Sequence, residues 1–183
     1  MGHKVQINFG FCIFLALMIL LLPIPWWTGA IIAALIHEGF HIMAVLICGG
    51  KIYDLSVTGM GAKIEAMSMT NAKQVFCALA GPLGSFSCLA ASEYFPELAI
   101  CGLIQGAYNL LPIFPLDGGR IIKYICAEAL CRGIEIFTLV MLTGIGLWLG
   151  TQSREVVLFF LISAWYPMIQ RKISCKERNL AVQ

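Results

Sequence analysis

Two histidines and a glutamate lie close together in a segment that carries no other charged side chain. His37, Glu38 and His41 are the only histidine, acidic or basic residues between Lys4 and Lys51. On a helix, residues four apart lie on one face, so both imidazoles can bind one tetrahedral metal ion. Glu38 can then act on the water that the metal activates. The pattern predicts a hydrolytic site with one Zn2+ ion and Glu38 as the catalytic base.

The apolar surroundings make a chance match to this pattern improbable. On soluble surface helices HExxH often binds nothing, because solvated side chains cost little there. A charged side chain at the centre of a bilayer costs roughly 2.5–3.5 kcal/mol, so such residues usually serve a function. We therefore expect a true metal site, and with it a third ligand.

The composition predicts an all-α polytopic membrane protein. Of the 183 residues, 60% are hydrophobic and 12% are charged, more apolar surface than a soluble domain can bury. With about 20 residues for each helix, the chain holds about six transmembrane helices. Residues 1–173 are expected to form a single membrane-embedded domain, and 174–183 a short polar cytoplasmic tail. The predicted spans are 7–25, 28–48, 73–93, 97–113 with a continuation after a break, 133–150 and 155–170.

The basic residues predict the orientation in the membrane. With six spans, eleven of the twelve lysines and arginines fall on the side of the termini, and Arg154 falls on the other. By the positive-inside rule both termini are cytoplasmic. The net charge of +2 follows from this topology, so no nucleic-acid partner is expected.

The fourth apolar segment contains a second unusual group of residues. Between Asn109 and Gly118 lie Pro112, Pro115 and Asp117, which no ordinary spanning helix contains. A helix broken in this way is tolerated at membrane depth where the chain borders protein or a wet cavity. Asp117 is the natural third ligand, because catalytic zinc commonly takes two histidines and one carboxylate. The alternative is that Asp117 caps a helix beginning at Gly118.

Residues 52–66 alternate in polarity around central glycines. This pattern favours a short, membrane-associated β-hairpin. The alternative is an ordinary cytoplasmic loop.

The two motifs together resemble the site-2 protease family of intramembrane zinc metalloproteases. HEGFH at 37–41 matches the family's HExxH, and residues 109–118 match its NxxPxxPxDG pattern. Gly81-Pro82 is similar to a glycine-proline turn in the helix between them. The resemblance covers residues 28–120, the catalytic core of the family.

The resemblance implies a role for each of these residues. His37, His41 and Asp117 bind zinc, and Glu38 is the base. Asn109 binds the backbone of a locally unwound substrate. Such an enzyme hydrolyses a peptide bond in or near the transmembrane segment of a membrane-tethered protein.

A chain this short, without a PDZ module, is most similar to the sporulation-factor branch of the family. That branch processes a membrane-tethered sigma-factor precursor, which implies a bacterial cell membrane, such a substrate, and a membrane inhibitor or regulator as a further partner. The residues after Ile173 are too few for the nucleotide-sensing CBS domain of those relatives. The oligomeric state is not predicted.

Two positions depart from the family's pattern. Gly39 and Phe40 stand in the reverse of the usual order before the second histidine, and Ser85 stands where relatives often have asparagine. Neither position is a ligand.

Two other functions are compatible with a metal motif in a membrane helix. One is a divalent-metal transporter, which needs further polar ligands on neighbouring spans. The other is an inactive membrane scaffold, which has no need for a buried Glu38.

Overall fold

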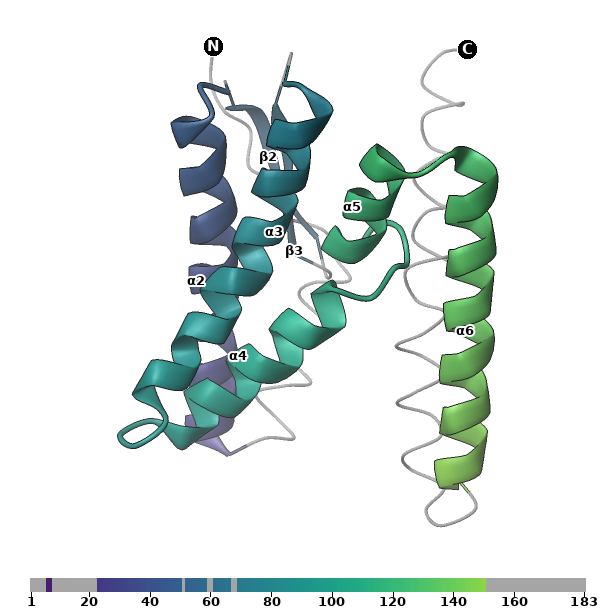
Figure 1. Ribbon diagram of the computed structural model, residues 1–183. Coiled ribbons are helices and arrows are strands. Elements are labelled where there is room, and N and C mark those ends of the chain that lie inside the picture. The colour runs from purple at the N-terminus through teal and green to yellow at the C-terminus, as the bar shows by residue number, and fades with distance from the viewer. Residues whose placement is uncertain (1–5, 8–22, 51, 59–60, 67–68, 151–183) are drawn as a thin grey trace. The chain divides into compact units, whose positions relative to one another are not determined.

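The structure is a computed structural model that describes residues 6–7, 23–50, 52–58, 61–66 and 69–150 (Figure 1). The chain divides into two compact units, Met1–Leu110 and Leu111–Gln183. Most of the predicted span 7–25 and all of the span 155–170 lie outside the described residues.

Helix α2 (Ile24–Ile47) carries the HEGFH motif. It begins at Ile24, four residues before the start of the predicted span 28–48, which left Pro25 outside this helix. Pro23 is its N-cap, and Pro25 lies in its first turn. The first turn accepts proline because the backbone N–H groups there have no partner within the helix.

Two further helices complete the helical part of the first unit. Helix α3 (Asn71–Ser87) continues into the 3-10 helix η1 (Cys88–Ala91), and α4 (Pro96–Asn109) follows. Helix α2 contacts both α3 and α4, and α3 contacts α4. Gly102 of α4 allows the close approach to α3, since a Cβ there would lie 2.5 Å from the backbone oxygen of Ser85.

Three strands form a small sheet in the first unit, in the order β1-β2-β3. Strand β1 (Gln6–Ile7) pairs parallel with β2 (Ile52–Thr58). Strand β3 (Gly61–Ala66) pairs antiparallel with β2 and contacts α2. The antiparallel register runs from Ile52 opposite Ala66 to Thr58 opposite Gly61.

The second unit begins in the proline-containing break. The fourth predicted span reached residue 113, but α4 ends at Asn109, because Pro112 lacks a backbone donor and disfavours helix in the residue before it. Helix α5 (Asp117–Ile125) follows the break, and α6 (Glu128–Gly150) follows α5. The predicted break is confirmed.

Three helices among the described residues are long and apolar enough to cross a membrane. Helix α4 has 14 residues, fewer than any of these three. The three begin two to five residues before the predicted spans 28–48, 73–93 and 133–150, and are Ile24–Ile47, Asn71–Ala91 and Glu128–Trp148. The prediction of six spans stays a prediction.

Candidate metal centre

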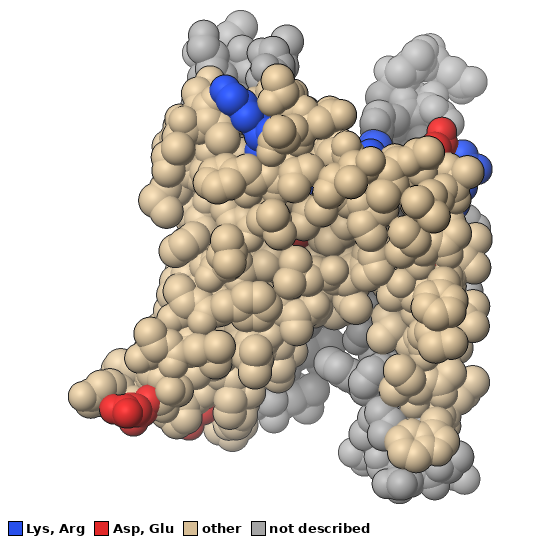
Figure 2. Space-filling view, in the orientation of Figure 1, with Lys and Arg blue, Asp and Glu red and all other residues tan. Residues whose placement is uncertain are grey.

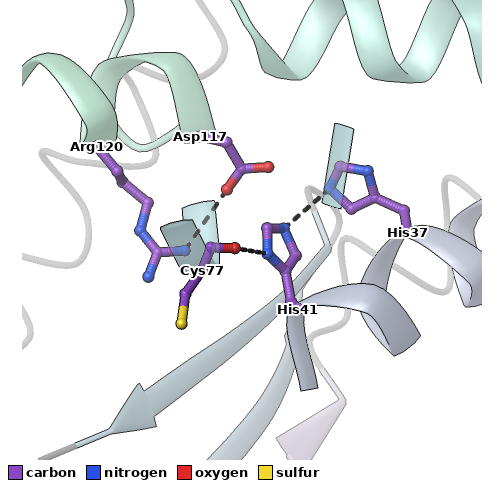
Figure 3. A network of polar contacts seen from close by, with 5 residues as sticks. All are labelled: His37, His41, Cys77, Asp117 and Arg120. Carbon is purple, nitrogen blue, oxygen red and sulfur yellow. Dashed lines mark hydrogen bonds and ion pairs between the residues drawn. The ribbon is translucent and has the colours of Figure 1, made fainter. Parts of the chain in front are cut away.

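His37 and His41 lie one turn apart on the buried face of α2, and their side chains converge (Figure 3). They are 3% and 6% exposed. The two Nε2 atoms are 3.2 Å apart, and the rings meet edge to face with an interplanar angle of 82°. The sequence prediction that these two imidazoles project from one face of a helix is confirmed.

The spacing of the two nitrogens fits a shared zinc ion. Two ligands of a tetrahedral ion, each at 2.0–2.1 Å from it, lie about 3.3 Å apart. The observed separation of 3.2 Å between the Nε2 atoms matches this expected ligand–ligand distance. Imidazole nitrogen is also a preferred donor for zinc, so both geometry and chemistry suit the metal.

Helix α3 holds both rings from the opposite side. The Nδ1 atom of His41 is 2.7 Å from the backbone oxygen of Cys77 (Figure 3), and the Nδ1 atom of His37 is 2.8 Å from the Ser85 hydroxyl oxygen. A carbonyl only accepts, so Nδ1–H of His41 donates and its Nε2 keeps a lone pair. Metal-binding histidines are usually held by such a bond from the other ring nitrogen.

Gly81 of α3 leaves the space in which the two imidazoles meet. A Cβ atom at this position would lie 2.2 Å from Nε2 of His41 and 2.8 Å from Nε2 of His37. Real Cβ contacts are never that short, so any other residue would displace the rings. The missing side chain is thus a requirement of the site.

The reversed order of Gly39 and Phe40 has a structural counterpart on α3. A Cβ at Gly84 would lie 2.5 Å from the Phe40 ring, so Gly84 makes room for that ring. A Cβ at Gly39 would meet nothing within 4 Å. Phe40 packs against the core formed by α2 and α3, one residue before His41. The departure from the family's pattern is therefore compatible with close packing at this point.

Glu38 follows His37 on α2 and is half-buried. Its Oε2 atom is shielded from solvent. Holding a carboxylate in such an apolar span is costly, which favours a functional role for it.

Asp117 lies in the second unit and is 5% exposed. Helix α5 begins at Asp117 itself, one residue before the start that the capping alternative requires. Its Oδ1 atom is 3.6 Å from Nη1 of Arg120, one turn further along α5 (Figure 3). His37 and His41 belong to the other unit, so the assignment of Asp117 as the third zinc ligand stays a prediction.

Asn109, the predicted substrate-binding residue, is the last residue of α4. Its side-chain amide is half-buried and donates to the backbone oxygen of Gln105, 3.1 Å away, within the same helix. This bond orients the amide at the end of the helix, where the proline-containing break begins.

Sequence reasoning missed the contribution of α3 to the site. Ser85, the Cys77 backbone oxygen and Gly81 all contact or surround the histidines. The available signal was the spacing of Gly81, Gly84 and Ser85 on one face of an otherwise apolar helix. A backbone oxygen has no sequence signal of its own.

The sequence is similar to known metalloproteases. The profile of Peptidase family M50 matches residues 69–150. A zinc metalloprotease of Methanocaldococcus jannaschii is 26% identical over 149 residues, which cover 70% of this chain and 44% of that protein. The chain thus spans less than half of the length of that curated relative.

A solved structure shows the same fold. The site-2 protease from Methanocaldococcus jannaschii superposes with a TM-score of 0.63 at 22% identity, covering 93% of this chain and 91% of that one. The fold is therefore that of a site-2 protease.

Proposed function

We propose that this protein is an intramembrane zinc metalloprotease that cleaves a membrane-tethered protein in or near its transmembrane segment. The observation that carries the proposal is the pair of buried imidazoles in a membrane-spanning helix, with Nε2 atoms 3.2 Å apart and both Nδ1 atoms held by α3. The similarity to M50 peptidases and to an archaeal zinc metalloprotease supports it.

The two compact units act together as one catalytic domain in this proposal. Helix α2 of the first unit supplies His37 and His41, and α5 of the second supplies Asp117 as the third ligand. Arg120 holds the Asp117 carboxylate from within α5. Two histidines and one carboxylate leave a fourth position open, as catalytic zinc sites require.

The chemistry divides between the metal and Glu38. When bound, zinc polarises a carbonyl and lowers the pKa of a water to about 7. Glu38 takes the proton from the attacking water and delivers it to the leaving amine. Glu38 follows His37 directly on the same helix, which fixes its backbone relative to that ligand. The apolar span limits bulk water around the carboxylate.

Substrate binding uses an extended backbone, because a helical segment hides its carbonyls in hydrogen bonds. Among the described strands, β1 and β3 are the two edges of the sheet, and β3, with six residues against two, is the longer edge to which a further strand can add. Strand β3 contacts α2, the helix that carries the histidines. Main-chain pairing at this edge tolerates varied side chains. Asn109 serves as a second contact for the unwound backbone.

The protein lies in a bacterial cell membrane with cytoplasmic termini, and a sigma-factor precursor is a candidate substrate. The first unit has basic and acidic groups at its opposite ends (Figure 2). Lys73 lies in the first turn of α3, and its ammonium donates to the Cys48 backbone oxygen at the end of α2. Glu93 and Glu97 lie after the other end of α3, so the basic end is the cytoplasmic one.

A cleavage assay tests the proposal. The full chain is co-expressed with membrane-tethered transcription factors, including a sigma-factor precursor, each tagged at both ends. We expect a released cytoplasmic fragment and a membrane stub with the intact chain, and uncleaved substrate with Glu38→Gln. Equal processing by the Glu38→Gln chain would contradict the proposed chemistry. Purified protein in vesicles, with and without a chelator, separates direct cleavage from the action of host proteases.

A further inference from the structure

Ser85 is a deeply buried polar residue whose hydroxyl needs a hydrogen-bond partner. It lies on α3 and is 0% exposed, among the most deeply buried side chains. Its hydroxyl oxygen is 2.8 Å from Nδ1 of His37, on another helix. A buried hydroxyl is costly unless it is hydrogen-bonded, so this contact accounts for its presence in an apolar helix.

The two histidines are held by groups of different character. The Cys77 backbone oxygen beside His41 can only accept, which fixes the proton of His41 on Nδ1. The Ser85 hydroxyl beside His37 can either accept or donate. The proton position on His37 therefore depends on the direction of the Ser85 hydrogen bond.

We propose that Ser85 is a positioning residue that orients the His37 ring for metal binding through Nε2, an inference that rests on the proposed zinc site. For His37 to bind zinc through Nε2, its Nδ1–H must donate to the Ser85 oxygen. Ser85 thus does for His37 what the Cys77 carbonyl does for His41.

A second serine on the same helix provides a matched control. The Ser87 hydroxyl donates to the Gly84 backbone oxygen, 2.6 Å away, within α3. Ser87 therefore represents a serine whose hydroxyl bonds only within its own helix. Ser85→Ala and Ser87→Ala remove the same atom from positions two residues apart, so a difference between them reports the contact with His37.

The first measurement is zinc affinity, by competition with a chromophoric chelator, on the full chain in detergent. Loss of a group that orients a metal-binding histidine typically weakens binding by about 10–100-fold, and we expect this for Ser85→Ala. Ser87→Ala should bind as the intact chain does. Ser85→Thr keeps the hydroxyl and should retain most of the affinity. Unchanged affinity of a folded Ser85→Ala chain would overturn the inference.

The second measurement is the hydrogen bond from Nδ1–H of His37, from the proton and nitrogen chemical shifts of the zinc-loaded chain labelled at histidine. The chain has only three histidines, which makes assignment by substitution practical. We expect a hydrogen-bonded Nδ1–H on His37 in the intact chain and in Ser87→Ala, and its loss in Ser85→Ala alone. An unchanged His37 signal in Ser85→Ala would refute the role of Ser85. If the intact chain bound no zinc, the proposed function would fail, whereas the same comparison of His37 shifts in the metal-free chain would still decide whether Ser85 holds the ring.

Discussion

Replacing Gly81 by alanine is the smallest change that should destroy the metal site. Gly81 lies on α3, facing both imidazoles of α2. An added Cβ would lie 2.2 Å from Nε2 and 2.5 Å from Cε1 of His41, and 2.8 Å from Nε2 of His37. One methyl group thus meets both ligand atoms at once, in a region where neither ring is solvent-exposed.

The size of the effect follows from the displacement required. Ordinary contacts begin at 3.4 Å, so Nε2 of His41 must retreat from 2.2 Å to 3.4 Å, by about 1.2 Å, whereas zinc–ligand distances tolerate only about 0.2 Å. The ring cannot simply rotate, because Nδ1 is held by the Cys77 oxygen at 2.7 Å. We expect zinc affinity to fall by more than about 100-fold, beyond the loss typical of a supporting group.

The assay is zinc affinity in detergent, with folding followed by circular dichroism. Gly39→Ala is the matched control, because Gly39 lies between the two histidines on α2 and a Cβ there meets nothing within 4 Å. Gly39→Ala should bind zinc normally and should stabilise the helix by about 0.5–1 kcal/mol. A folded Gly81→Ala chain that bound zinc like the intact protein would refute the placement of α3 against the histidines.

Three further predictions follow from the same geometry. Glu38→Gln should retain zinc but lose cleavage, whereas His41→Ala should lose both; residual processing by Glu38→Gln at the normal rate would remove the base role. Gly84→Ala should destabilise the chain, because its Cβ would lie 2.5 Å from the Phe40 ring, and Phe40→Leu should partly restore stability in thermal unfolding. If the double variant Gly84→Ala, Phe40→Leu lost as much stability as Gly84→Ala alone, the added methyl group and the Phe40 ring would not be in steric conflict. A reporter fused after Gln183 should be active only in its cytosolic form, and activity of the exported form alone would invert the topology.

The pairing of the two histidines could be predicted from sequence because it depends only on helix periodicity. His37 and His41 are four apart on a continuous helix, so no tertiary information is needed to bring their rings together. The proline break was readable for a similar reason, since the effect of Pro112 on the backbone is local. Predicted boundaries failed where a local rule was misapplied. Pro25 was assigned outside α2, although the first turn of a helix accepts proline.

The supporting groups could not be read from sequence, because they depend on how α3 faces α2. Whether Ser85 meets His37 or its own backbone, as Ser87 does, is decided by the packing of the two helices. The same holds for Gly81 and Gly84, whose spacing alone indicates close helix packing and not which side chain fills the space. The backbone oxygen of Cys77 gives no signal in the side-chain sequence.

X-ray absorption spectroscopy of the zinc-loaded chain tests the assignment of the three zinc ligands. We predict one zinc ion per chain, with two imidazole nitrogens at about 2.0–2.1 Å and carboxylate or water oxygens at about 2.0–2.2 Å. Asp117→Ala should remove one oxygen from this shell and weaken binding, and His37→Ala should remove one imidazole. A shell containing sulfur at about 2.3 Å, from any of the eight cysteines, or a spectrum unchanged by Asp117→Ala, would contradict the assignment of His37, His41 and Asp117 as the zinc ligands.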